Sequence, residues 1–176
     1  MPNYRRAWTP GGTYFFTVNL WRRKNSALLL DHIDVLRDAI RWTRNRYPFL
    51  IHGWVVLPDH MHCILTLPEQ DADYALRWRL IKAQFSKNID DDEWRLASRQ
   101  MRGERGIWQR RYWEHLILHE QDFVAHMNYV HFNPVKHGLV ARVCDWPYST
   151  FHRLVQSGVY PRDWACKADP VANYHD

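Results

Sequence analysis

Two histidines separated by a single residue are the feature of this sequence best suited to chemistry. His60 and His62 lie within residues 57–67, a mainly apolar run typical of a strand. Successive side chains of a strand point to opposite faces, so both imidazoles lie on one face, while Met61 and Cys63 lie on the other. Two neutral imidazoles side by side can bind a divalent metal ion.

A tyrosine and an asparagine one helical turn apart form the second candidate group. Tyr129 and Asn133 lie four residues apart in a segment predicted to be helical, so both project from the same face. A tyrosine phenolate can attack a phosphodiester and remain attached to it as a phosphotyrosine. Pro134 disfavours helical geometry at the residue before it, so we expect the helix to end or bend at Asn133.

The sequence leaves the third ligand of such a metal ion open. Two imidazoles and one amide oxygen would leave positions for a phosphate and water, a mixed nitrogen and oxygen set compatible with Mg²⁺ or Mn²⁺. His126, three residues before Tyr129, shares its helix face and is the alternative to Asn133. Cys63 faces away from His62, which makes a zinc site of histidine and cysteine the poorer interpretation.

The composition favours a nucleic-acid partner and argues against several other classes of protein. The 176-residue chain has a net charge of +5 and ten tryptophans, which suit phosphate binding and base stacking. The three cysteines form no Cys-x-x-Cys pair, which argues against a disulfide framework or a zinc ribbon and suits a reducing cytoplasm. No apolar run is long enough to span a bilayer, so we expect neither secretion nor membrane insertion.

Hydrophobic periodicity predicts a single α+β domain over residues 1–156, followed by a C-terminal tail over 157–176 that packs on or near it. Strands are predicted at 13–20, 49–56, 60–67 and 112–119, helices at about 31–47, 72–88 and 120–135, and a surface loop at 90–106. The βαββαβ order with an added helix predicts a ferredoxin-like fold, an antiparallel sheet with two helices on one face. The other face then carries His60 and His62, with the third helix over it.

Ten basic residues are candidate contacts to DNA phosphates, although any one of them could equally be solvated surface. They are Arg5, Arg6, Arg22, Arg23, Lys24, Arg77, Arg79, Lys82, Arg110 and Arg111. The tail could cover a DNA groove lined by such residues.

These motifs together resemble those of the REP-associated tyrosine transposases, a branch of the single-tyrosine HUH endonucleases. The resemblance covers nearly the whole chain and is carried by residues 57–62 (LPDHMH), 108–115 (WQRRYWEH), 129–140 (YVHFNPVKHGLV) and 146–149 (WPYS). It implies that His60 and His62 are the metal-binding pair and that Tyr129 is the nucleophile. It also implies that Asn133 stands where related transposases have a third, glutamine ligand.

The resemblance further implies the HUH endonuclease fold, in which the added helix is catalytic, and Mg²⁺- or Mn²⁺-dependent cleavage of single-stranded DNA beside a hairpin. Cleavage would leave a 5′-phosphotyrosine and a free 3′-hydroxyl, and strand transfer would be the reverse reaction on a new end. The expected partners are repetitive extragenic palindromes folded as hairpins with a short 5′ guide. The resemblance favours a monomer in the bacterial cytoplasm, associated with the nucleoid, and leaves a dimer open.

Two other functions remain open from the residues alone. A domesticated hairpin-binding protein would keep the fold and the basic surface but have little cleavage activity. A metal-dependent nuclease could use water as the nucleophile, with Tyr129 only orienting it. Charge and aromatic content also leave RNA open as a substrate.

Overall fold

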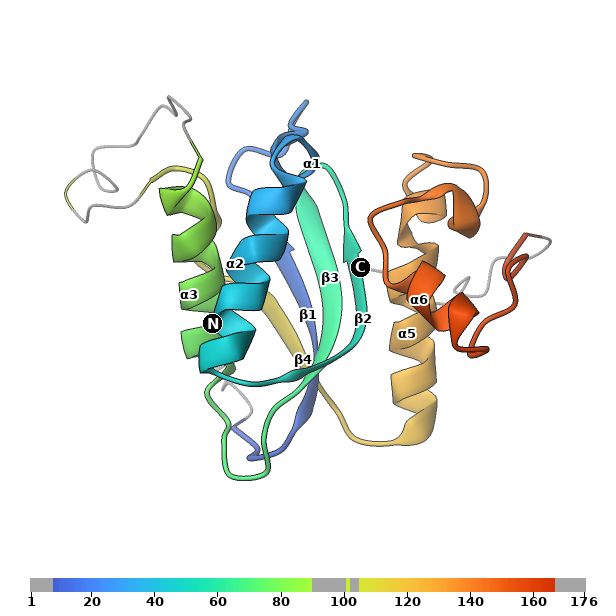
Figure 1. Ribbon diagram of the computed structural model, residues 1–176, viewed down its shortest axis with the longest axis horizontal. Coiled ribbons are helices and arrows are strands. Elements are labelled where there is room, and N and C mark those ends of the chain that lie inside the picture. Colours follow the sequence, from blue (N-terminus) through green and yellow to red (C-terminus); the bar gives the residue numbers. More distant parts are fainter. Residues whose placement is uncertain (1–7, 90–100, 102–104, 167–176) are drawn as a thin grey trace, which may run out of the picture.

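A four-stranded antiparallel sheet occupies the middle of the protein in a computed structural model that describes residues 8–89, 101 and 105–166 (Figure 1). The strands are β1 (Thr13–Asn19), β2 (Leu50–Val56), β3 (His60–Thr66) and β4 (Trp113–Ile117), in the order β2-β3-β1-β4. β1 and β3 are the inner strands and are rich in apolar and aromatic residues, which suit burial. The strand that carries the histidine pair is therefore held between two neighbours.

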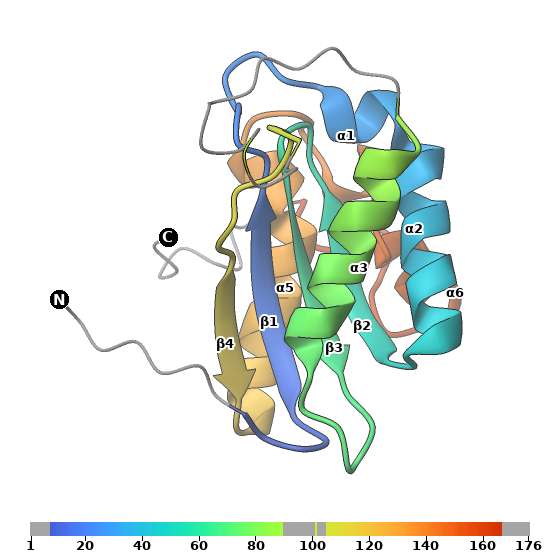
Figure 2. The same ribbon diagram turned by 90° about the vertical axis from the view of Figure 1, so that its left-hand side faces the viewer.

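Helices cover both faces of the sheet, as two views at right angles show (Figure 1, Figure 2). The helices are α1 (Leu28–Asp31), α2 (Ile33–Arg46), α3 (Tyr74–Lys87), α5 (Glu120–Lys136), η1 (Val143–Asp145) and α6 (Phe151–Gln156). α2 and α3 pack on one face, and α5 packs on the other with α6 beyond it. This arrangement confirms the predicted α+β fold and its βαββαβ order with an added helix. No helix in the described ranges has the length and apolar character needed to cross a membrane.

The predicted ends of these elements differ from the observed ends by at most two residues. The start of α2 illustrates the reason. Residues 28–31 form the separate helix α1, and His32 ends it with φ −115° and ψ 35°, so α2 begins only at Ile33. Most of the predicted surface loop at 90–106, namely 90–100 and 102–104, lies outside the described residues.

The alternation of β3 divides its side chains between two hydrophobic cores, as predicted. Met61 and Cys63 belong to the core beneath α2 and α3, where they are fully buried. Ile64 belongs to the second core, which also contains Val130 of α5. His60 and His62 therefore face α5 and not α2 and α3.

The end of α5 differs from the prediction. The helix runs through Asn133 and Pro134 to Lys136, so the prediction that it could end at Asn133 is wrong. Pro134 lies in the last turn, where its missing N–H removes only one bond, to the carbonyl of residue 130. Gly138 ends the helix with φ +67°: its N–H donates to the Val135 carbonyl, and the Leu139 N–H donates to the Pro134 carbonyl.

The segment after η1 runs beside the outer strand β2. The Val56 N–H donates to the Tyr148 carbonyl at 2.9 Å, and the Thr150 N–H donates to the Trp54 carbonyl at 2.9 Å. The following residues, up to 166, fold back onto α5, where the Tyr160 hydroxyl donates to Asn128 Oδ1 at 3.1 Å. Residues 157–166 are the first part of the predicted tail, and residues 167–176 lie outside the described residues.

Candidate active site

The histidine pair of β3 lines a cavity of about 610 Å³ that lies between the sheet and α5. The ring centroids of His60 and His62 are 5.0 Å apart, so the structure confirms that both imidazoles share one face. Their exposed fractions are only 4% and 3%, because α5 covers this face of the sheet. The pair therefore meets ligands inside the cavity and not on the open surface.

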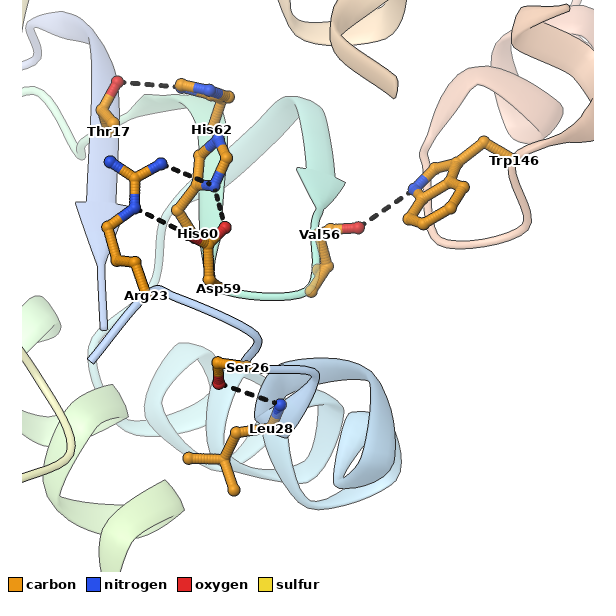
Figure 3. Close-up of polar contacts among 9 residues, drawn as sticks. All are labelled: Thr17, Arg23, Ser26, Leu28, Val56, Asp59, His60, His62 and Trp146. Atoms are coloured by element: carbon orange, nitrogen blue, oxygen red, sulfur yellow. Dashed lines mark hydrogen bonds and ion pairs between the residues drawn. The ribbon is translucent and has the colours of Figure 1, made fainter. Parts of the chain in front are cut away.

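A threonine on the neighbouring strand orients His62. The register of β1 and β3 places Thr17 opposite His62, and Thr17 Oγ1 lies 2.8 Å from His62 Nδ1 (Figure 3). The other ring nitrogen, Nε2, is buried and has no hydrogen-bond partner among the described residues. Burial, together with the nearby His60 and His137, holds the pKa of His62 well below its usual value of 6.5. The imidazole is therefore neutral at pH 7, as a metal ligand must be.

A carboxylate orients His60 in the same way. Asp59 Oδ1 lies 2.5 Å from His60 Nδ1, and Asp59 Oδ2 accepts from Arg23 Nε at 2.7 Å (Figure 3). Burial raises the pKa of Asp59, but the hydrogen bonds from His60 and Arg23 outweigh it and bring this pKa below its usual value. Burial lowers the pKa of His60 below its usual value, although the hydrogen bond and the charge of Asp59 act to raise it. A carboxylate on one ring nitrogen is a common way to fix the tautomer of a metal-binding histidine.

Tyr129 lies against His62 of the histidine pair, on α5 across the cavity. α5 positions the side chain, which is 4% exposed and lines the cavity. The Tyr129 ring meets the His62 ring edge to face, with centroids 5.2 Å apart. Lys136, two turns further along α5, places its Nζ atom 4.8 Å from the centre of the same ring. The structure therefore brings together the tyrosine and the histidines that the sequence predicted.

Asn133 is fully buried, and neither Oδ1 nor Nδ2 of its amide has a hydrogen-bond partner among the described residues. Such unpaired polar atoms are costly unless a ligand binds them. His60 and His62 are neutral and supply two nitrogen donors. The Nε2 atom of His62 is itself buried and unpaired among the described residues. Two imidazole nitrogens and one amide oxygen are a donor set that a divalent cation accepts. Asn133 is not among the residues that line the cavity, so the cavity brings His60, His62 and Tyr129 together without it.

The alternative ligand His126 lies with a different group of residues. Its Nδ1 atom is 2.9 Å from both the backbone carbonyl and the Oδ1 atom of Asp122. Its ring stacks on His115 with centroids 4.7 Å apart. His126 therefore lines the same cavity as the histidine pair without joining it.

His137 is a residue of the cavity that sequence reasoning did not include among the ligands. It follows α5 directly, lines the cavity, and its ring centroid is 5.1 Å from that of His60. The spacing of four residues after Asn133 is the signal that could have identified it, because α5 continues past Pro134.

Comparison with known proteins identifies the family to which this chain belongs. A protein from Escherichia coli named REP-associated tyrosine transposase is 50% identical over 165 residues, which cover 94% of this chain and 92% of the relative. This chain belongs to the REP-associated tyrosine transposase family. A Haemophilus influenzae protein named for the same family is 46% identical over 96% of each chain. No family model matches the chain.

A solved REP-associated tyrosine transposase has the same fold as this chain. It was determined bound to a REP hairpin, and it shares 48% sequence identity with a TM-score of 0.83. The match covers 99% of this chain and 95% of the solved one. The α+β architecture described above is therefore that of the REP-associated tyrosine transposases.

One of the basic residues predicted to contact DNA is not on the surface of this REP-associated tyrosine transposase fold. Arg77 is 1% exposed, so the prediction of a phosphate contact is wrong. Its guanidinium donates to the Pro48 and Asp73 carbonyls and to Asp71 Oδ2, at 2.8–3.0 Å. Position 77 lies on the face of α3 that packs inward, beside Trp78.

The other predicted basic residues lie at several places around this fold. Arg23 lines the cavity and pairs with Asp59. Lys82 is half-buried and donates to the Gln109 carbonyl at 2.9 Å. Arg23 is exposed, as are five others, namely Arg22, Lys24, Arg79, Arg110 and Arg111. Arg5 and Arg6 lie outside the described residues.

Proposed function

We propose that the protein is a metal-dependent single-stranded DNA endonuclease and strand transferase that cleaves beside palindromic hairpin repeats. The observation that carries this proposal is the contact between Tyr129 and His62 inside one cavity, at 5.2 Å between ring centroids. Tyr129 is the nucleophile, and His62 is a neutral donor whose Nε2 has no partner among the described residues. Both side chains line the same cavity. A phosphodiester entering that cavity would meet both.

His60 and His62, which line the cavity, are the residues that would hold a metal ion, Mg²⁺ or Mn²⁺. Asn133, buried and unpaired but not part of the cavity lining, is the third ligand that we propose. When bound, the ion would favour the phenolate form of the tyrosine and draw charge from the non-bridging phosphate oxygens. Thr17 and Asp59 keep the two imidazoles oriented, each through Nδ1. Both rings then have Nε2 available for the ion.

Tyr129 would supply the nucleophile through its phenolic oxygen. The oxygen forms a bond to phosphorus as the bond between phosphorus and the 3′ oxygen breaks. The phenolic proton passes to solvent, and the leaving 3′ oxygen takes up one proton, so one phosphoester replaces another. The Lys136 ammonium, 4.8 Å from the ring, adds positive charge that stabilises a phenolate. Attack by a new 3′-hydroxyl on the phosphotyrosine would reverse the step and join the strands.

The partner we propose is a single-stranded DNA hairpin of the repetitive extragenic palindrome type, with a short guide on its 5′ side. The support is the solved relative bound to a REP hairpin, which matches 99% of this chain. Arg110 and Arg111 precede β4 and are exposed, as are Arg22 and Lys24 after β1. These guanidinium and ammonium groups would contact phosphates and hold the strand at the cavity. We propose that a monomer suffices, because the proposed nucleophile and ligands come from one chain.

The experiment uses a hairpin labelled at its 5′ and 3′ ends, incubated with Mg²⁺ or Mn²⁺ and separated on denaturing gels. We expect a covalent protein–DNA adduct on the fragment 3′ of the nick, absent in Tyr129→Phe and in His62→Ala. Tyr47→Phe is the matched control, because Tyr47 is an exposed tyrosine at the end of α2. Cleavage that persists without an adduct in Tyr129→Phe would instead show that water is the nucleophile. Hairpin binding with no cleavage would show a binding protein.

A further inference from the structure

Three side chains at the far end of the cavity bring metal-binding atoms close together. His115 comes from β4, and Asp122 and His126 come from the first turns of α5. Their candidate ligand atoms all lie within 4.8 Å of one another. His115 Nε2 is 2.8 Å from Asp122 Oδ2, and His126 Nδ1 is 2.9 Å from Asp122 Oδ1. One carboxylate therefore bridges two imidazoles.

This group is separate from the histidine pair. β1 lies between β3, which carries His62, and β4, which carries His115. Two strands separated by a third are about 10 Å apart, so these imidazoles cannot share one ion. Phe15 of β1 contacts both groups, with its ring centroid 5.7 Å from that of His62 and 4.7 Å from that of His126. An apolar ring therefore fills the space where the two groups meet.

The protonation states of the group suit a cation. Burial raises the pKa of Asp122, but the hydrogen bond from His115, together with the charges of His115 and His126, outweighs burial and brings this pKa below its usual value. Burial lowers the pKa of His126. At pH 7 the carboxylate is therefore charged and this imidazole neutral, as metal binding requires.

We propose that His115, Asp122 and His126 form a second site, which binds one divalent transition-metal ion such as Mn²⁺, Co²⁺ or Zn²⁺. Two imidazole nitrogens and one carboxylate oxygen are a ligand set that these ions accept, and Mg²⁺ accepts less readily. Three protein ligands leave further coordination positions open. All three residues line the 610 Å³ cavity, so these positions face its interior. The proposal does not depend on nuclease activity.

The test counts Mn²⁺ ions bound by the metal-stripped full-length protein without DNA, from the free Mn²⁺ signal in electron paramagnetic resonance. We expect two ions in the wild type and one in the His60→Ala/His62→Ala variant. Asp122→Asn should remove one ion from the wild type, and should remove the remaining ion from the double variant. Asp34→Asn, an exposed carboxylate on α2, is the matched control and should change nothing.

A second variant guards against misfolding. The His115 side chain is 40% exposed, so His115→Gln should fold normally, which circular dichroism checks. It should weaken Mn²⁺ binding at this site by at least tenfold. An ion count and affinity unchanged in both Asp122→Asn and His115→Gln would overturn the proposal. A single ion that depends on Asp122 and not on His62 would support it, and would count against metal binding at the histidine pair.

Discussion

The His62 imidazole and the Tyr129 phenol meet edge to face across the cavity, with ring centroids 5.2 Å apart. One ring comes from an inner strand and the other from the helix that covers it, 67 residues later in the chain. Both are at most 4% exposed, so packing against the sheet and α5 fixes their relative position. A group held in this way can be substituted without moving its neighbour, which makes the following predictions testable.

Tyr129→Phe should abolish the adduct and lower cleavage by at least about a thousandfold, because it removes the nucleophilic oxygen. The phenyl ring still packs on His62 and Phe15, so the free energy of unfolding should change by less than about 1 kcal/mol. Denaturing gels and urea titration measure the two effects. Hairpin affinity, from gel shifts, should stay within about threefold of the wild type; a larger loss would mean that the hydroxyl serves binding.

Thr17→Val should weaken Mn²⁺ binding by about tenfold or more, because it removes the hydroxyl that orients His62 through Nδ1. It should also lower the free energy of unfolding by about 1–3 kcal/mol, since a buried ring nitrogen loses its partner. Metal titration and urea denaturation measure these effects. Thr13→Val is the control on the same strand, because the Thr13 hydroxyl bonds to Thr66, away from the cavity. Equal Mn²⁺ affinity in both variants would contradict the role assigned to Thr17.

Arg77→Met should lower the free energy of unfolding by about 2–4 kcal/mol, because it removes hydrogen bonds to two carbonyls and a carboxylate from a buried position. Hairpin affinity measured below the unfolding transition should not change. Arg79→Met, at an exposed position on the same helix, should leave stability nearly unchanged. Loss of hairpin affinity in folded Arg77→Met would instead support the hypothesis, suggested by the sequence, that Arg77 contacts a DNA phosphate.

Stability should fall as the pH is lowered from about 6.5 to 4, in part because of His131. Burial lowers the pKa of His131 from 6.5 to about 4, so in this range the unfolded chain takes up a proton that the folded protein does not. The loss attributable to this group is up to about 3 kcal/mol. His131→Gln should make the dependence of unfolding free energy on pH shallower by about one proton. Identical slopes in wild type and variant would contradict this.

Periodicity predicted most of the fold because it reports which face of an element is buried. The alternation around His62 and the helical spacing of Tyr129 and Asn133 were enough to place these residues on opposing elements. Arg77 shows the limit of this reasoning: charge suggests exposure, but a guanidinium can be buried when carbonyls surround it. The grouping of His115 with His126 depends on the pairing of β4 with β1, which short-range patterns do not encode.

Residues 148–150 hydrogen-bond to the outer edge of β2, which limits how copies of this protein can associate through their sheets. An unpaired strand edge is a template on which another chain can add a strand. Val56 and Trp54 already use backbone groups on their outer side to bind Tyr148 and Thr150, which protects that edge. Among the described strands this leaves β4 as the only side on which the sheet could be extended. Self-assembly by strand addition would therefore have to occur next to His115, at the rim of the cavity.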